Sequence, residues 1–474
     1  MSHQEGNCSS ETKTIKTVNL TIDGIPVSVP EGTKILDAAK KANVDIPVLC
    51  DHPDLCKRAL CRICVVEADG RGKLIAACAN DVWEGVKIVT RNKRIAKIRR
   101  TIIELILAKH PQDCLSCVRN KNCELQKLSL GYGVFKTPFK NEPVFWPVTT
   151  ECDALDHDMS KCVKCCRCVD VCQEIQTIRA VNTSYRSHKF RIATPYKQAM
   201  EETPCVFCGQ CARVCPVGAI YEHDQTAEVL SAFTAGKKTI AQVLPALASA
   251  LDKEFSLPEG TVTTGKMIAA IKLLGFDKVY DAANTVNAVN IDISREVQAK
   301  AGKQTKPIIS VCSEGVSRFI NNFYPELSVC LTAVKTPRKI FASIIKGSYA
   351  KEAGTDSSNV ISVSFVPCIA QKYTTQKDTS DFALTSKELA KMIKLTGVEI
   401  ENLEEAQFDT INISCNADNN LPKKLIVHGF AQAREVMEAI IKGECDTDWV
   451  EILSCPQDSS SSKDCVCSSG CQAD

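Results

Sequence analysis

Residues 162–172 read CVKCCRCVDVC, and residues 205–216 read CVFCGQCARVCP. Each stretch has the spacing Cys-x2-Cys-x2-Cys-x3-Cys, and a proline follows the second. Four cysteine thiolates at this spacing are typical ligands of [4Fe–4S] clusters. Neither zinc binding nor disulfide formation explains why the same four-cysteine run occurs twice. The two stretches therefore predict one small module that holds two iron–sulfur clusters.

The expected ligand sets of this module follow from the way that two-cluster ferredoxin modules use such runs. The fourth cysteine of each run ligates the cluster of the other run. One cluster is therefore expected on Cys162, Cys165, Cys168 and Cys215. The other cluster is expected on Cys205, Cys208, Cys211 and Cys172. Cys166 is an extra thiol beside a ligand, and we do not expect it to bind iron.

The composition of the chain limits what its thiols can do. The chain has 474 residues, 28 of them cysteine, and a formal charge of +2. A chain of this length can fold without disulfides, and its start, MSHQEGNCSS, lacks the basic and apolar parts of a secretory signal. We therefore expect a soluble, cytoplasmic protein whose thiols bind metal. The small charge gives no basic field for nucleic acid, and no apolar run approaches the roughly 20 residues that span a bilayer.

A third group of cysteines lies in the first part of the chain, at Cys50, Cys61, Cys64 and Cys78. The unit around it starts with two alternating apolar runs, Val18–Ile22 and Ile25–Val29. A helical pattern over residues 34–43 follows, with Thr33 as its expected N-cap. This order predicts a small α+β domain over residues 14–92. Soft thiolates suit zinc as well as iron–sulfur clusters, so the ligand types alone leave the metal open.

A fourth group of metal-binding residues follows an amphipathic helical pattern at residues 92–108. Its spacing is His-x3-Cys-x2-Cys-x5-Cys, and its members are His110, Cys114, Cys117 and Cys123. The face of the helix that we expect to be buried consists of Ile95, Ile98, Ile102, Leu105 and Ile106. Three cysteines and one histidine also form a known zinc site, so this spacing too leaves the metal open.

These two groups resemble known iron–sulfur domains. The first resembles the β-grasp [2Fe–2S] ferredoxin-like domain at the start of many iron–sulfur oxidoreductases. The second, with Asn122, Glu124, Leu125 and Leu128 beside it, resembles the His(Cys)3 [4Fe–4S] module of complex I large subunits and iron-only hydrogenases, here over residues 93–138. The resemblance implies one [2Fe–2S] cluster and one [4Fe–4S] cluster. A neutral imidazole ligand makes the second cluster less negative, which should raise its potential and suits an electron entry or branching point.

The second half of the chain alternates strand and helix patterns, which predicts an α/β domain. Six of its segments resemble the catalytic domain of [FeFe] (iron-only) hydrogenases. They are IKLLGFDKVYD (271–281), FYPEL (323–327), TPRKIF (336–341), VPCIAQK (366–372), KELAKMIK (387–394) and VEILSC (450–455). Together with the cluster modules, the resemblance covers residues 16–457, although the region after Lys394 is much shorter than in the family.

The resemblance implies a multidomain fold of α+β and α/β parts. The β-grasp ferredoxin-like domain and the His(Cys)3 module would be followed by a two-cluster, bacterial-ferredoxin-like module at residues 150–225. A truncated [FeFe]-hydrogenase-like α/β domain would occupy residues 236–457. Residues 458–474 would form a tail rich in serine and cysteine.

The positions that hold the active-site H-cluster in this family differ in this chain. The family motif Thr-Ser-Cys-Cys-Pro corresponds to residues 310–314, which places Ser313 at a ligand position and retains the proton-relay thiol as Cys312. The motif Met-Pro-Cys-x-x-Lys corresponds to residues 366–371. There the ligand Cys368 remains, but Gln371 replaces the lysine that contacts the diiron unit.

Two further positions of the family's active site also change. Of the two ligand cysteines in the third motif, Cys455 is present, whereas Ser459 stands at the position that bridges to the diiron centre. Ile293 stands where the family has a glutamate of the proton path. A serine hydroxyl stays protonated near neutral pH and is a hard ligand, so it binds cluster iron far less well than a thiolate. We therefore expect no working H-cluster.

A different cluster in this place remains an alternative. The tail cysteines Cys465, Cys467 and Cys471 could fold back and join Cys312, Cys368 and Cys455. The simpler interpretation is a solvated, serine-rich tail with free thiols. The catalytic region is therefore expected to lack hydrogen chemistry under either interpretation.

The resemblance implies an iron–sulfur electron-transfer subunit of a multi-subunit oxidoreductase. Its expected cofactors are one [2Fe–2S] and three [4Fe–4S] clusters, and its expected partners are ferredoxin and a flavin- or NAD(P)-binding subunit in a hetero-oligomer. The chain has no glycine-rich nucleotide fingerprint between a strand and a helix, so nucleotide chemistry would belong to a partner. Two alternatives are an active ferredoxin-dependent hydrogenase with unusual ligands and a redox-sensing protein.

Overall fold

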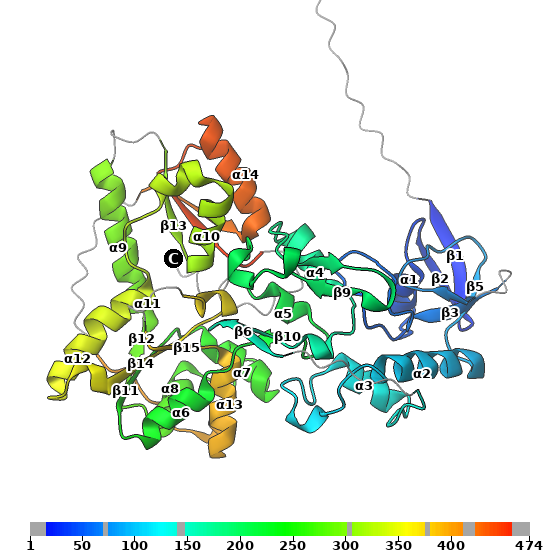
Figure 1. Cartoon of the computed structure of the whole chain (residues 1–474), viewed down its shortest axis with the longest axis horizontal. Coiled ribbons are helices and arrows are strands. Elements are labelled where there is room, and N and C mark those ends of the chain that lie inside the picture. The colour runs from blue at the N-terminus through cyan, green and yellow to red at the C-terminus, as the bar shows by residue number, and fades with distance from the viewer. Residues whose placement is uncertain are drawn as a thin grey trace, which may run out of the picture. The chain divides into compact units, whose positions relative to one another are not determined.

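The computed structural model describes residues 16–69, 74–139, 147–300, 306–374, 380–410 and 422–456 (Figure 1). By its internal contacts the chain divides into two compact units. The first contains Met1–Phe145, Ser160–Cys166 and Pro216–Gly218, and the second contains Trp146–Met159, Arg167–Cys215 and Ala219–Asp474. Each unit has a hydrophobic core among its described residues, so each is held together by its own apolar side chains.

The first unit contains a five-stranded sheet with the strand order β2-β1-β5-β3-β4. β1 (Thr17–Ile22) and β2 (Ile25–Pro30) form the antiparallel hairpin that the two apolar runs predict. Asp23 and Gly24 form its turn, with φ angles of 49° and 84°. The other strands are β3 (Val65–Ala68), β4 (Leu74–Ala76) and β5 (Lys87–Val89).

The helix α1 (Ile35–Lys41) buries its apolar side chains in the same core as β1. It begins later than the sequence pattern predicts. Lys34 rather than Thr33 is its N-cap, because the Thr33 hydroxyl donates a hydrogen bond to the carbonyl oxygen of Pro30 (2.6 Å) instead of capping the helix.

The helix α2 (Lys93–Leu107) forms where the sequence predicts it, and the Asn92 side chain caps it by accepting a hydrogen bond from the backbone N–H of Ile95. Its buried face, however, consists of Ile95, Arg99 and Ile103, whereas Leu105 is 49% exposed. The predicted face was therefore wrong at Leu105. Arg99 is buried because its guanidinium donates to a backbone carbonyl oxygen on β3 (2.7 Å). α3 (Glu124–Gly131) completes this part of the first unit.

The second unit begins with short elements around the two cysteine runs. A three-stranded sheet has the order β10-β7-β6, and β8 pairs with β9 as an antiparallel hairpin. The strands are β6 (Thr149–Cys152), β7 (Leu155–His157), β8 (Asn182–Ser184), β9 (Arg191–Ala193) and β10 (Ile220–Glu222). The helices are α4 (Arg167–Asp170), a π-helical turn at Val171–Ile175, and α5 (Gln210–Val214).

Two parallel sheets form the rest of the second unit, which confirms the expected α/β organisation. One has the order β12-β11-β14-β15, with β11 (Lys238–Val243), β12 (Lys278–Asp281), β14 (Val360–Phe365) and β15 (Phe382–Leu384). The other has the order β13-β17-β16, with β13 (Ile308–Val311), β16 (Lys424–His428) and β17 (Trp449–Leu453).

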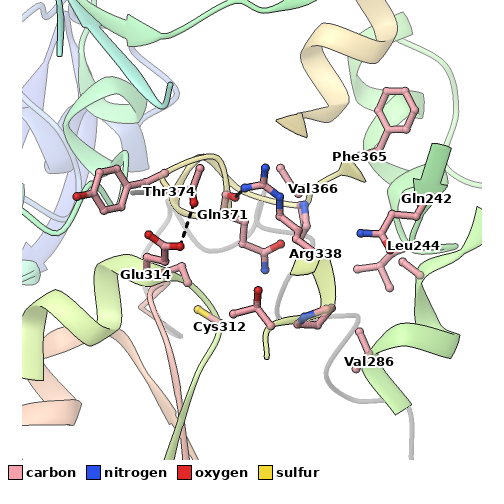
Figure 2. Close-up of a pocket in the computed structure, with 16 residues that line it drawn as sticks. Gln242, Leu244, Val286, Cys312, Glu314, Arg338, Phe365, Val366, Gln371 and Thr374 are labelled. Carbon is pink, nitrogen blue, oxygen red and sulfur yellow. Dashed lines mark hydrogen bonds between the residues drawn. The ribbon is translucent and has the colours of Figure 1, made fainter. Parts of the chain in front are cut away.

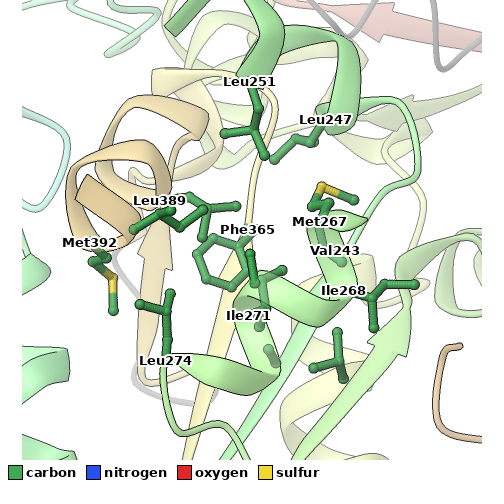
Figure 3. Packing of buried hydrophobic residues seen from close by; sticks show 14 of the residues in the cluster. Val243, Leu247, Leu251, Met267, Ile268, Ile271, Leu274, Phe365, Leu389 and Met392 are labelled. Atoms are coloured by element: carbon green, nitrogen blue, oxygen red, sulfur yellow. The ribbon is translucent and has the colours of Figure 1, made fainter. Parts of the chain in front are cut away.

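Helices surround these sheets and bury apolar side chains against them (Figure 1). They are α6 (Thr226–Thr234), α7 (Leu247–Phe255), α8 (Thr264–Leu273), α9 (Ala282–Lys300), α10 (Glu314–Phe323), α11 (Pro337–Ile340), α12 (Lys346–Glu352), α13 (Ser386–Thr396) and α14 (Gly429–Lys442). Figure 3 shows Phe365 of β14 among Leu251 of α7, Ile271 of α8 and Leu389 of α13. This close packing of helices on the sheet fixes the positions of the strand ends, where the pocket described below lies.

The carboxyl ends of four parallel strands supply the residues of one region. β11, β13, β14 and β17 are followed directly by Leu244, Cys312, Val366 and Ser454. Ligand sites in open α/β sheets lie outside such strand ends, where the loops begin. Among the residues that the structure describes, no helix combines the length and the apolar character needed to cross a membrane.

Candidate cluster sites and the pocket beside them

The four cysteines of the first unit's sheet domain lie as two thiol pairs. The Sγ atoms of Cys64 and Cys78 are 3.3 Å apart, and the backbone N–H of Cys61 donates to the Sγ of Cys50 (3.4 Å). A hydrogen bond from the Cys61 thiol lowers the pKa of Cys50 to about 6, and one from Cys78 lowers the pKa of Cys64 to about 7. Two pairs of thiols, each with one member that readily becomes a thiolate, suit the two irons of a [2Fe–2S] cluster.

The His110 group lies between α2 and α3. Cys114 is exposed at the start of a short 3₁₀ turn, and Cys117 and Cys123 are half-buried. Burial raises the pKa of Cys123, and the charges of Cys117 and Cys114 raise it further, so the three thiols share one electrostatic environment. Gly218 packs beside them, because a Cβ atom there would lie 3.3 Å from the Cys117 Sγ.

The first cysteine run of the two-cluster module is divided between the compact units. Cys162 and Cys165 belong to the first unit, and the backbone N–H of Lys164 donates to the Cys162 Sγ (3.4 Å). Cys168 on α4 and Cys215 at the end of α5 are buried in the second unit. The extra thiol, Cys166, is also buried.

The other predicted set lies wholly in the second unit, and the structure brings its members together. Burial raises the pKa values of Cys205, Cys208 and Cys211, that of Cys208 to about 12, and the charge of Cys172 raises all three further. Cys172, the fourth cysteine of the other run, packs against the same apolar cluster as Cys205 and Cys208. This arrangement fits the exchanged-ligand pattern, since iron binding would displace the protons that burial otherwise holds on the sulfurs.

The loop that carries Cys205 and Cys208 packs closely against the hydrogenase-like part. Gly209 has a φ of +75°, and a Cβ atom there would lie 2.6 Å from the side chain of Ile369. On the other side, a Cβ atom at Gly315 of α10 would lie 2.0 Å from the carbonyl oxygen of Val206. Only glycine fits at these two positions, so the loop and the α/β part approach each other at backbone distance.

A pocket of about 100 Å³ lies at the strand ends described above. Figure 2 shows the side chain of Gln371 near the centre of the pocket, next to Arg338, with Glu314 and Cys312 nearby. The Glu314 carboxylate accepts a hydrogen bond from the Thr374 hydroxyl (2.9 Å). The pocket lining also includes Gln242, Leu244, Ala282, Val286, Ser313, Thr336, Pro337, Phe365, Val366, Pro367 and Tyr373.

Two serines and a cysteine stand beside this pocket. The Ser313 hydroxyl is buried and lies 3.1 Å from the hydroxyl of Ser454, whose oxygen is 3.5 Å from the Cys312 Sγ. Burial and the charge of Cys368 raise the pKa of Cys312 to about 12. Cys455 is buried next to Ser454. The structure thus brings Cys312, Ser313 and Cys368 into one region, as their motifs predict.

Several predicted residues fall elsewhere. Ser459, Cys465, Cys467 and Cys471 lie outside the described residues. Ile293 is buried on α9 in an apolar cluster with Ile308. Within the described ranges, no three His, Cys, Asp or Glu side chains lie close enough together to hold a single metal ion.

Two cationic side chains near the pocket, Arg338 and Lys372, were not predicted from the sequence. Arg338 donates to the backbone carbonyl oxygen of Gln371 (2.6 Å) and to the Ser380 hydroxyl (3.0 Å). Lys372, which follows Gln371, is fully buried and pairs with Glu388 of α13 (2.6 Å). Burial raises the pKa of Glu388 to about 7. Because these partners are distant in the sequence, no local motif indicates them.

Four family models match successive parts of the chain. The 2Fe–2S iron–sulfur cluster binding domain matches residues 15–93, and the NADH-ubiquinone oxidoreductase-G iron–sulfur binding region matches residues 99–138. The ferredoxin-like domain of NADH-quinone oxidoreductase subunit 3 matches residues 152–221. The C-terminal domain of the iron-only hydrogenase large subunit matches residues 237–424. The chain therefore contains [2Fe–2S] and [4Fe–4S] binding domains joined to a hydrogenase-like domain.

Whole-chain relatives place these domains in one family. The chain is 34% identical to the NADP-reducing hydrogenase subunit HndD of Solidesulfovibrio fructosivorans, over 83% of this chain and 71% of the relative. It is 30% identical to iron hydrogenase 1 of Clostridium pasteurianum, over 82% and 70%. The NADPH-Fe(3+) oxidoreductase subunit alpha of Geobacter sulfurreducens is 32% identical over 43% of this chain and 24% of its own length. The chain belongs to the iron-only hydrogenase family.

Proposed function

We propose that this chain is an iron–sulfur electron-transfer subunit of a multi-subunit, ferredoxin- and NAD(P)-linked oxidoreductase, and that it has no hydrogen chemistry of its own. The observation that carries the proposal is the contrast at Ser313. This ligand position holds a buried hydroxyl that lies 3.1 Å from a second hydroxyl, Ser454, in a family whose members ligate iron there with a thiolate. Two neutral hydroxyls that lie beside each other are poor ligands for the iron of an iron–sulfur cluster.

The cluster sets complete the proposal. The [2Fe–2S] cluster would bind to Cys50, Cys61, Cys64 and Cys78, and one [4Fe–4S] cluster to His110, Cys114, Cys117 and Cys123. The other two would bind to Cys162, Cys165, Cys168 and Cys215, and to Cys205, Cys208, Cys211 and Cys172. The separate thiol pairs of the first set and the approach of Cys172 to the last set support these assignments. When bound, such clusters supply one-electron redox chemistry.

We propose the domain boundaries to be those of the sequence pattern: 14–92 (β-grasp), 93–138, 150–225 (bacterial-ferredoxin-like), 236–457 and the tail 458–474. The matched ranges of the four family models support their order. Gly209 and Gly315 would then serve electron transfer, because their lack of side chains lets the Cys205–Cys208 loop lie directly on the α/β part.

The proposed partners follow from the names of the relatives. HndD is a subunit of an NADP-reducing hydrogenase, and the relative from Geobacter sulfurreducens is a subunit of an NADPH-linked oxidoreductase. By analogy, this chain would exchange electrons with ferredoxin and with a flavin- or NAD(P)-binding subunit in a hetero-oligomer. A cytoplasmic location is part of the proposal, because the cluster thiols must stay reduced until iron is loaded.

The test is to purify the protein without oxygen, measure iron and acid-labile sulfide, and assay hydrogen evolution from a reduced dye. The proposal expects iron matching one [2Fe–2S] and three [4Fe–4S] clusters, with no hydrogen evolved. Iron for one further [4Fe–4S] cluster, lost in a Cys368→Ser variant, would instead indicate a cluster on Cys312, Cys368 and Cys455. Hydrogen evolution would contradict the proposal and favour an active hydrogenase with unusual ligands.

A further inference from the structure

Arg318 on α10 binds the backbone of the segment that leads into a predicted cluster ligand. Its Nε donates to the carbonyl oxygen of Cys205 (3.0 Å). One terminal nitrogen donates to the carbonyl oxygens of Glu201 (2.8 Å) and Thr203 (3.0 Å). The planar guanidinium is thus fixed by three bonds against the start of the Cys205–Cys208 loop.

The guanidinium of Arg318 faces backbone carbonyl oxygens and two aromatic rings. Its guanidinium carbon lies 5.7 Å from the ring centre of Phe207 and 5.9 Å from that of Tyr373, and these two rings stack with centres 4.1 Å apart. In the part of the chain that the structure describes, its contacts are carbonyl oxygens and aromatic rings, and no carboxylate forms a salt bridge with it. A full positive charge therefore stands beside the loop.

We propose that the positive charge of Arg318 raises the reduction potential of the cluster on Cys205, Cys208, Cys211 and Cys172. The inference rests on the proposed function, since it requires that cluster. Reduction adds one negative charge, and a fixed cation nearby stabilises the reduced form more than the oxidised form. Arginine keeps its charge at every working pH, so the effect does not depend on protonation.

The test is a redox titration, followed by electron paramagnetic resonance, on four variants of the full chain and on the unmodified protein. The relevant signal is the one that disappears in Cys208→Ser. Arg318→Gln should lower its midpoint potential, whereas Arg318→Lys, which retains the charge, should lower it much less. Lys394→Gln is the matched control, because Lys394 also binds a carbonyl oxygen (Glu254, 2.6 Å) and covers a ring (Phe255, 4.8 Å). It should leave the potential unchanged.

Equal midpoint potentials in Arg318→Gln and the unmodified protein would overturn the inference. Equal shifts in Arg318→Gln and Arg318→Lys would also overturn it, because they would show that the geometry of the arginine, and not its charge, sets the potential. If Arg318→Gln does not fold, Glu201→Gln replaces it. Glu201 is exposed; burial raises the pKa of Tyr373, and the charge of Glu201 raises it further. Its removal should raise the same midpoint potential slightly, and no change or a decrease would contradict the inference. If Cys208→Ser loses no signal, the proposed function fails with it.

Discussion

The Cys205–Cys208 loop and the pocket at Cys312 lie in the same compact unit, yet they differ in the side chains that could bind iron. The loop has every thiol that its spacing predicts, and Cys172 joins it from the other run. At the pocket, by contrast, Ser313 and Gln371 stand where the family resemblance implies a ligand thiol and a lysine, and Ser313 contacts a second serine. The α/β scaffold nevertheless still packs against the loop at Gly315. Under the proposed function, the difference teaches that a fold can persist after the cluster ligands at its active site have been replaced.

The largest expected effect comes from replacing a ligand cysteine in the Cys205–Cys208 loop. Cys208→Ser should remove one [4Fe–4S] cluster, because a serine hydroxyl cannot replace a thiolate ligand. Iron analysis and electron paramagnetic resonance would record the loss of one cluster and of its signal. The control is Cys166→Ser, which changes a buried thiol that is not a predicted ligand. Equal iron contents in the two variants would contradict the ligand assignment.

Next in size is the effect of breaking the buried ion pair next to the pocket. Lys372→Met should destabilise the protein by about 3–5 kcal/mol, because it removes the cation that pairs with the buried Glu388 carboxylate. Lys391→Met removes an exposed partner of Asp224 on the same helix as Glu388 and should cost about 1 kcal/mol or less. Chemical denaturation followed by circular dichroism compares the two. Similar losses of stability would show that Lys372 has no special role.

A pH dependence of about 3 kcal/mol is expected from His157 on β7, which lies within the proposed two-cluster module. Burial lowers the pKa of His157 from 6.5 to about 4. Between these two values the unfolded chain binds more protons than the folded chain, so the free energy of unfolding falls as the pH drops from about 6.5 to about 4. Denaturation midpoints measured across this range should decline less steeply in His157→Gln. An unchanged slope in that variant would assign the acid sensitivity to other groups.

The smallest expected effect tests the contact between the two regions. Gly315→Ala should destabilise the second unit by about 1–3 kcal/mol, because the new methyl group would overlap the carbonyl oxygen of Val206. Gly347→Ala on α12 is the matched change in open space, and it should stabilise its helix by up to about 1 kcal/mol. Thermal unfolding distinguishes the two variants, because the melting temperature should fall in Gly315→Ala and rise in Gly347→Ala. A gain in stability at both positions would mean that the loop does not approach α10 so closely.

Local patterns in the sequence account for much of the fold and for the candidate ligands. The alternation around Asp23 and Gly24 predicts the first hairpin, which the structure confirms. The cysteine spacing predicts that Cys172 ligates the same cluster as the Cys205 run, and Cys172 packs against the same apolar cluster as Cys205 and Cys208. What local patterns miss are contacts between distant residues. Periodicity does not indicate that Arg99 is buried against a backbone carbonyl oxygen, nor that Lys372 pairs with Glu388. These polar groups are buried because partners from other elements satisfy them, and helical or strand periods carry no such information.

The central claim is that the pocket holds no H-cluster, and infrared spectroscopy tests it most directly. The protein would be produced together with the accessory proteins that build the cluster, with a catalytically active iron-only hydrogenase as the positive control. The account predicts no bands in the region where iron-bound carbon monoxide and cyanide absorb, both in the unmodified chain and in Ser313→Cys, which restores one thiol but not the lysine at Gln371. Such bands in the unmodified chain would show that Ser313 and Gln371 are tolerated, and would contradict the account.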